Sequence, residues 1–301
     1  MIAYLKKIRR LWFWWKYLRR NKYRNDTWYF ILKYGIGDAY MVSALLPEFI
    51  KQNPKVVLIF ENKNQLFIPG LFVKDADVRL VTELPYELIA EFGSFRKGIP
   101  VVLHPIHLFD GKLLSVIGLK GATLMDVYKI ILGLDFDVKP ALPRFGDVQD
   151  DTVDQLFIRY ALAKNRTVLL CPQANSIGLL DHSFWIRLAE KIQGIGLTPV
   201  FMNVKENVKG FQSVGFPLSD SKAFCDQAGY VVSLRSGFCD LIATSSAKKI
   251  ILYPNIRFHS ARLIESTRLI DLELAEQTGL LEIEIDEEDV VMNKVMDFIN
   301  G

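Results

Sequence analysis

The sequence has few cysteines and histidines and no long apolar run. Its 301 residues include three cysteines and four histidines. Cys171, Cys225 and Cys239 are too widely spaced for a disulfide framework or a zinc site, which predicts a reducing, cytoplasmic location. The apolar stretches are shorter than the ~18 residues that cross a bilayer, so we expect no transmembrane helix. An apolar core followed by a small-residue cleavage site is also missing, so no secretory signal is expected.

Acidic residues are missing from the first 25 positions, which carry nine lysines and arginines. At about 100° per residue, the apolar side chains of this segment fall within one arc of about 140°. They are Tyr4, Leu5, Ile8, Leu11, Trp12, Trp15 and Leu18. This stripe beside a cationic face predicts that residues 1–22 form a helix on an anionic membrane surface, separate from the folded body. Docking on its own domain or on another subunit is the alternative. Nucleic acid is not expected, because phosphate binding needs no such stripe.

The rest of the chain predicts an α/β protein. Half of the residues are apolar and 24% are charged, which excludes disorder and low complexity. Eight short β-rich runs alternate with amphipathic segments, as in parallel sheets covered by helices. The runs are residues 27–33, 55–60, 78–81, 99–104, 166–171, 198–202, 230–234 and 249–253. Residues 138–149, rich in proline and glycine, are the expected boundary. We therefore expect a helix over 1–25 and two Rossmann-like, doubly wound domains, 26–148 and 149–301, facing a central cleft.

Ligands of such sheets bind at the carboxyl ends of the strands. The turn after the first run contains Gly35 and Gly37, which permit a close approach of backbone to a ligand. Asp38 follows at the start of a helix, where its carboxylate is a candidate base or, alternatively, only a cap. His104 and His107 follow the fourth run, and we expect them to line the substrate site and not to bind metal.

Two further turns offer groups to a phosphate. Asn175 and Ser176 follow the fifth run with an amide and a hydroxyl. The turn Arg235-Ser236-Gly237 with Asp240 ends another run and opens a helix. We expect it to bind an anion through its peptide N–H groups and the guanidinium. A structural ion pair between Arg235 and an aspartate is the alternative.

Spaced motifs resemble the heptosyltransferase-like bacterial glycosyltransferases. Gly37-Asp38 with Ser43-Ala44-Leu45-Leu46-Pro47 is similar to the family's opening Gly-Asp turn and its "P/S-A-L" segment. Tyr128–Leu134 followed by Lys139–Phe145 resembles the "LLGL…P.LP" end of the first domain. Trp185 with Leu188-Ala189 resembles the "W…FA.LA" helix of the second. The likeness runs from about residue 29 over nearly the whole chain and implies the two-domain glycosyltransferase B fold.

Two departures from this family change the charges of the expected donor site. The family's "D-S/T-G-x-x-H" becomes Arg235-Ser236-Gly237-Phe238-Cys239-Asp240, so that arginine and aspartate replace acid and histidine. The lysine that the family places before its tryptophan has no counterpart near His182. Arg235 would replace the lost positive charge at the diphosphate.

The resemblance implies an inverting, metal-independent glycosyltransferase without a cofactor. It would move a sugar from a nucleotide-diphosphate donor to a lipid-linked or surface-glycan acceptor at the cytoplasmic face of the membrane. Asp38 would act as base, with Gly35, Gly37, His104 and His107 on the acceptor side. The residues on the donor side would be Asn175, Ser176, Arg235, Ser236, Gly237 and Asp240. A non-catalytic nucleotide-sugar or glycan-binding protein on a degenerate transferase fold is the alternative.

Overall fold

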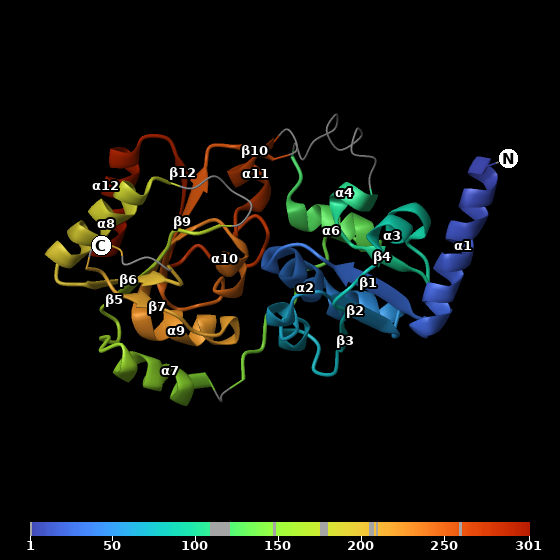
Figure 1. Ribbon diagram of the computed structural model, residues 1–301. Coiled ribbons are helices and arrows are strands. Elements are labelled where there is room, and N and C mark those ends of the chain that lie inside the picture. The colour runs from blue at the N-terminus through green and yellow to red at the C-terminus, as the bar shows by residue number, and fades with distance from the viewer. Residues whose placement is uncertain are drawn as a thin grey trace.

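A computed structural model describes residues 2–108, 121–146, 149–174, 180–204, 208, 210–258 and 261–301. Two α/β halves lie side by side, each built on a parallel sheet (Figure 1). All eight predicted strands are present with ends within two residues of the expected positions. The predicted α/β class is therefore confirmed.

The first sheet has the strand order β3-β2-β1-β4, and all its pairs are parallel. Its strands are β1 (Trp28–Leu32), β2 (Val56–Phe60), β3 (Asp77–Leu80) and β4 (Pro100–Val102). Helices α2 (Ile36–Gln52) and α6 (Leu124–Leu132) pack on one face, and α1 (Ile2–Arg20) and α3 (Tyr86–Phe92) cover the other. The order reverses between β1 and β4, which places the expected ligand crevice at the carboxyl ends of these two strands.

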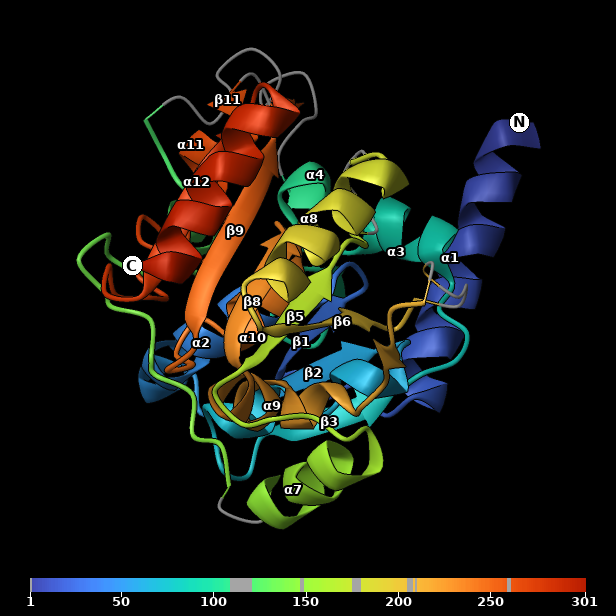
Figure 2. The ribbon, with the colours of Figure 1, turned by 90° about the vertical axis from the view of Figure 1, so that its left-hand side faces the viewer.

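The second sheet has the order β12-β9-β8-β5-β6-β7, again parallel. Its strands are β5 (Thr167–Cys171), β6 (Thr198–Met202), β7 (Ser213–Val214), β8 (Gly229–Leu234), β9 (Lys248–Pro254) and β12 (Leu280–Ile285). Helices α8 (His182–Gly194) and α12 (Glu288–Asn300) cover one face, and α7 (Gln149–Arg159) and α9 (Ser221–Ala228) the other (Figure 2). The reversal here lies between β5 and β8.

Shorter elements connect these layers. They are η1 (Lys63–Gln65), η2 (Pro69–Leu71), α4 (Pro105–Leu108), η3 (Leu218–Asp220), α10 (Gly237–Leu241), β10 (Arg257–Phe258), β11 (Ala261–Arg262) and α11 (Leu263–Thr267). Strand β12 was not among the predicted strands, because its alternating leucine, glutamate and isoleucine residues are untypical of a strand buried on both faces. As the edge strand beside β9, it has less to bury.

The N-terminal helix is part of the fold, which corrects the expectation of a separate arm. Trp14 is 6% exposed and lies in one apolar cluster with Tyr29 and Ile31 of β1. Its ring is 6.2 Å from that of Phe92 in α3, and Tyr23 packs edge-on against Tyr29 at 4.5 Å. The alternative of docking on its own domain therefore holds for this face of α1. None of the described helices is long and apolar enough to cross a membrane.

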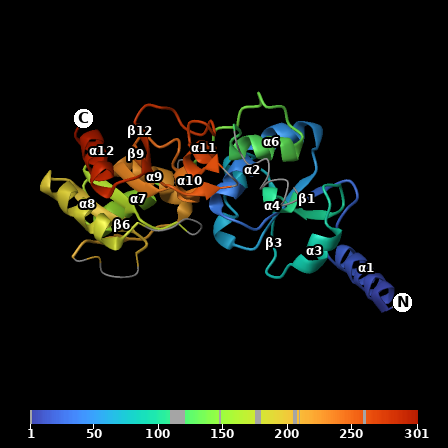
Figure 3. The ribbon, with the colours of Figure 1, turned by 90° about the horizontal axis from the view of Figure 1, so that it is seen from above.

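The two halves meet where α2 and α10 lie against each other (Figure 3). One apolar cluster joins buried residues of both halves, including Leu45 of α2 and Tyr128 of α6 with Tyr253 of β9 and Leu263 of α11. Lys129 of α6 lies 3.7 Å from Glu273 of the second half. The exact domain limits stay a prediction, and residues 147–148 lie outside the described part of the chain.

Candidate active site

Asp38 lies where the first sheet reverses its order, as the third residue of α2 and six residues after β1 ends. Its Oδ2 accepts a hydrogen bond from the peptide N–H of Gly35 at 3.1 Å, so the carboxylate does cap the helix. Its side chain is 18% exposed, which leaves it open to a ligand. A carboxylate that caps a helix can still accept a proton from a ligand, because each of its oxygens has two lone pairs.

Tyr128 of α6 binds the other carboxylate oxygen. Its hydroxyl donates to Asp38 Oδ1 at 2.6 Å, and its ring is completely buried. Burial, and then the negative charge of Asp38, raise the pKa of the Tyr128 hydroxyl well above its usual value, which keeps the phenol protonated. Tyr128 therefore acts as a fixed donor that sets the orientation of Asp38. Sequence reasoning missed this contact, because 90 residues separate the two side chains and no local pattern joins them.

His104 follows β4 and reaches the same place. Its Nε2 lies 3.9 Å from Asp38 Oδ1, and its ring centroid is 4.1 Å from that of Tyr34. Its Nδ1 accepts the peptide N–H of Ile106 at 3.2 Å, so the neutral ring carries its proton on Nε2, on the side of Asp38. His107 lies in α4, but its side chain is outside the described part of the structure.

The close approach expected at the first turn is made by the other half of the protein. A Cβ on Gly37 would lie 2.6 Å from Asp240 Oδ2, and a Cβ on Gly237 would lie 2.4 Å from the peptide nitrogen of Gly37. Glycine at both positions lets α2 and α10 touch. Gly35 is less constrained, because an added Cβ would lie 3.6 Å from Asp38 Oδ2 and 3.9 Å from the peptide nitrogen of Gly37, which are ordinary van der Waals distances.

Arg235 forms the ion pair that stood as the alternative to anion binding. Its Nη2 donates to Asp240 Oδ1 at 2.7 Å and its Nη1 to Oδ2 at 3.2 Å. The remaining bonds go to the carbonyls of Thr267, at 2.9 Å, and Ser236, at 2.6 Å. Both charged side chains are buried, Arg235 being 5% and Asp240 0% exposed. Although burial alone would lower it, the Asp240 carboxylate raises the pKa of Arg235, which stays charged.

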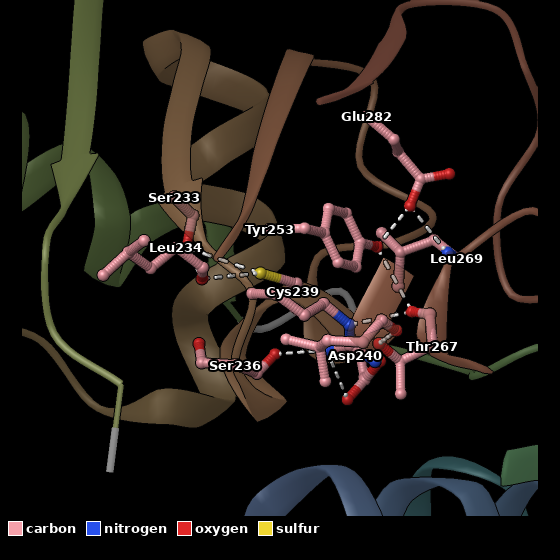
Figure 4. Close-up of polar contacts among 11 residues, drawn as sticks. Ser233, Leu234, Ser236, Cys239, Asp240, Tyr253, Thr267, Leu269 and Glu282 are labelled. Atoms are coloured by element: carbon pink, nitrogen blue, oxygen red, sulfur yellow. Dashed lines mark hydrogen bonds and ion pairs between the residues drawn. The ribbon is translucent and has the colours of Figure 1, made fainter. Parts of the chain in front are cut away.

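A wider polar network surrounds this pair (Figure 4). The Tyr253 hydroxyl donates to the carboxylate of Glu282, and the peptide N–H of Leu269 donates to the same oxygen at 2.8 Å. The same hydroxyl lies 3.2 Å from the carbonyl oxygen of Thr267, which also accepts a hydrogen bond from Arg235, so its one hydrogen is shared between Glu282 and Thr267. The network fastens α10 to β9, β12 and the segment after α11. It holds the turn 235–237 in place against α2.

The remaining predicted residues are those expected to bind the donor. Asn175 and Ser176 lie outside the described residues, so their role stays a prediction. The donor-binding roles of Ser236, Gly237 and Asp240 stay predictions as well, and the buried pairing of Arg235 favours a bracing role for it. Within the described part of the chain, no three His, Cys, Asp or Glu side chains are grouped as a metal site requires.

Among known proteins, the matches to this chain come from solved structures. No protein-family model and no curated protein sequence matches the chain. Its fold is similar to E. coli ADP-heptose lipopolysaccharide heptosyltransferase II, with a TM-score of 0.62 and 11% identity over 91% of this chain and 98% of that one. It is also similar to a glycosyl transferase family 9 structure from Veillonella parvula, with a TM-score of 0.59 and 9% identity over 92% of this chain and 98% of that one. For E. coli heptosyltransferase WaaC with ADP, the TM-score is 0.50 and the identity 11% over 90% of this chain and 98% of that one.

These similarities extend over both halves of this chain and over nearly the full length of heptosyltransferase II and of the family 9 structure. At such low sequence identities they show a shared fold and nothing more. The strand orders and the facing turns of α2 and α10 agree with the architecture expected from the sequence motifs. The chain therefore has the glycosyltransferase B fold, in the form found in the bacterial heptosyltransferases.

Proposed function

We propose that this protein is a nucleotide-sugar-dependent glycosyltransferase with Asp38 as its catalytic base. The observation that carries the proposal is the position of Asp38. It is a partly exposed carboxylate at the β1/β4 reversal, oriented by Tyr128, on the helix α2 that meets α10 of the second half. Solved structures of the same fold are described as ADP-heptose-dependent or contain ADP, which supports this class of donor.

The proposed reaction is a single displacement with inversion. Asp38 takes the proton of an acceptor hydroxyl while that oxygen forms a bond to the anomeric carbon of the donor sugar. The bond from this carbon to the diphosphate oxygen breaks, and its electron pair leaves with the nucleoside diphosphate. Two lone pairs of the Asp38 carboxylate are engaged by Gly35 and Tyr128, so others remain to accept the proton.

We assign the donor to the loops that follow β5 and β8, where the second sheet reverses its order. Arg235 would act there as a positioning residue that fixes the turn at Ser236 and Gly237 through Asp240. The proposed reaction is metal-independent, as the resemblance to the heptosyltransferase-like enzymes implies. The acceptor would be a lipid-linked or surface glycan at the cytoplasmic face of the membrane, reached through the carboxyl edge of the first sheet.

Nucleotide binding is the first test. We expect one nucleoside diphosphate among ADP, GDP, UDP and CDP to raise the unfolding temperature of the full chain, with inorganic phosphate as control. A ligand at about 100 times its Kd adds ~2.7 kcal/mol of stability, enough to measure by thermal shift. No shift with any of the four would contradict the proposal. Binding without turnover of any matching sugar nucleotide would favour the non-catalytic alternative.

The role of Asp38 is tested by Asp38→Asn, with release of nucleoside diphosphate from the matching sugar nucleotide as the assay. The asparagine can accept from Gly35 and donate to the Tyr128 oxygen, so the turn should persist. Loss of a general base lowers turnover by about 10²–10⁴-fold, while donor affinity should be unchanged. Asp126→Asn is the matched control, because Asp126 is also the third residue of its helix and forms the same capping box with Thr123. Equal turnover in both variants would show that Asp38 is only a cap.

A further inference from the structure

Helix α1 presents an apolar face that the body of the protein leaves uncovered. We call this face the α1 stripe and define it as Leu5, Ile8, Leu11, Trp12 and Trp15. These side chains are 59, 47, 44, 53 and 51% exposed, respectively. Figure 3 shows the helix at the outer end of the first half, directed away from the second half. Two indole rings are therefore held in solvent at one end of the molecule.

The opposite side of α1 is fastened to the body. Trp14 is buried against Phe92, and its ring stacks on Tyr17 at 5.7 Å. Arg10 Nε lies 2.6 Å from Glu91 Oε2, and Nη2 lies 3.8 Å from Glu87 Oε2. These contacts on α3 decide which face of α1 points outward. The α1 stripe is therefore a preformed surface and needs no folding step when it binds.

The charged side chains of α1 itself are all positive. The exposed cations on the helix are Lys6, Lys7, Arg9, Lys16, Arg19 and Arg20. Two of them lie over the exposed indoles, with Arg19 3.9 Å from the Trp15 ring centroid and Lys16 5.2 Å from that of Trp12. Indole rings and cations together suit the headgroup region of a bilayer, where the ring is half in hydrocarbon and the cation meets lipid phosphate.

We propose that the α1 stripe is a rigid docking surface for an anionic lipid bilayer. Leu5, Ile8, Leu11, Trp12 and Trp15 enter the interface, and the flanking cations contact the lipid phosphates. Because Trp14 and Arg10 fix α1 on α3, the bilayer holds the whole first half in one orientation. A second copy of this chain fits the α1 stripe less well, since two such helices would bring twelve exposed cations together without an acid between them.

Cosedimentation of the full chain with vesicles tests this surface without reference to any enzymatic activity. The vesicles are phosphatidylcholine containing about one third phosphatidylglycerol, compared with pure phosphatidylcholine. We expect binding to the first and little to the second. Trp12→Ala/Trp15→Ala should weaken binding by about 10- to 100-fold, because two half-exposed aromatic rings lose their burial in lipid. Their exposure in the free protein predicts an unchanged unfolding temperature.

The matched control is Leu142→Ala/Ile158→Ala, which removes two apolar side chains that are each 71% exposed and lie outside α1. This variant should bind the vesicles as the unaltered chain does. Equal binding to both kinds of vesicle, or unchanged binding of the tryptophan double variant, would overturn the proposal. A concentration-dependent dimer that the tryptophan double variant abolishes would overturn it in favour of a second copy. Failure of nucleotide binding or turnover would leave this surface unaffected, so the two proposals fail separately.

Discussion

At the scale of single residues, the buried charges at α10 are engaged with each other. A guanidinium that is 5% exposed and has four protein acceptors has little capacity left for a diphosphate. Arginine and aspartate at the two ends of the motif thus form a bridge within the turn. The resemblance to the heptosyltransferase motif holds for its spacing and its glycine, while the chemistry of its two ends differs.

We predict that Arg235→Met lowers the free energy of unfolding by about 3–5 kcal/mol, because it leaves the Asp240 carboxylate buried without its partner. The double variant Arg235→Met/Asp240→Leu should be more stable than this single variant, since it removes both buried charges. Urea denaturation of the three proteins measures the difference. A single variant with unchanged stability and weakened nucleoside diphosphate binding would restore Arg235 as a direct ligand.

At the scale of elements, α1 is apolar on its docked face and also on the face that it turns to solvent. Its docked face joins the cluster formed by Tyr29, Ile31, Val57 and Ile59, while the α1 stripe meets solvent. A helical wheel reports only the hydrophobicity of each face. It does not report which of two aromatic faces finds a partner, and here the buried tryptophan, Trp14, lies outside the predicted stripe.

We predict that Trp14→Ala releases α1 from α3 and Trp15→Ala does not. Truncating a buried tryptophan typically costs about 3–5 kcal/mol, whereas Trp15 is 51% exposed. Hydrogen exchange of residues 5–22 should therefore rise in the first variant and remain unchanged in the second. Equal protection in both would show that Trp14 does not hold the helix.

At the scale of the whole molecule, two glycines set the distance between the halves. A Cβ on Gly237 would lie 2.4 Å from the nitrogen of Gly37 and 2.8 Å from the Cβ of Ile36. Backbone atoms cannot move aside as the tip of a side chain can. The facing turns, and with them Asp38 and the Arg235–Asp240 pair, keep their separation because both positions lack a side chain.

We predict that Gly237→Ala separates the halves and lowers the free energy of unfolding by about 1–3 kcal/mol, the usual cost of overpacking. Gly194→Ala is the control, because an added Cβ there meets nothing within 4 Å. Thermal unfolding compares their stabilities, and small-angle X-ray scattering detects an increase in overall size. Equal stability and size in the two variants would contradict a tight contact between α2 and α10.

The local structure of this protein follows from short stretches of its sequence. Apolar runs and amphipathic segments specify β1 to β9 apart from the short β7, and they do so because periodicity is a property of neighbouring residues. Asp38 and the turn at Arg235 were predicted as site residues because both follow buried strands, whose carboxyl ends bind ligands in parallel sheets. The partners of these residues, in contrast, depend on how the chain packs: Tyr128 for Asp38, Asp240 for Arg235, and Gly237 for Gly37. Buried charges, phenols and close backbone contacts are satisfied by whatever the packing brings near, and sequence spacing does not contain that information.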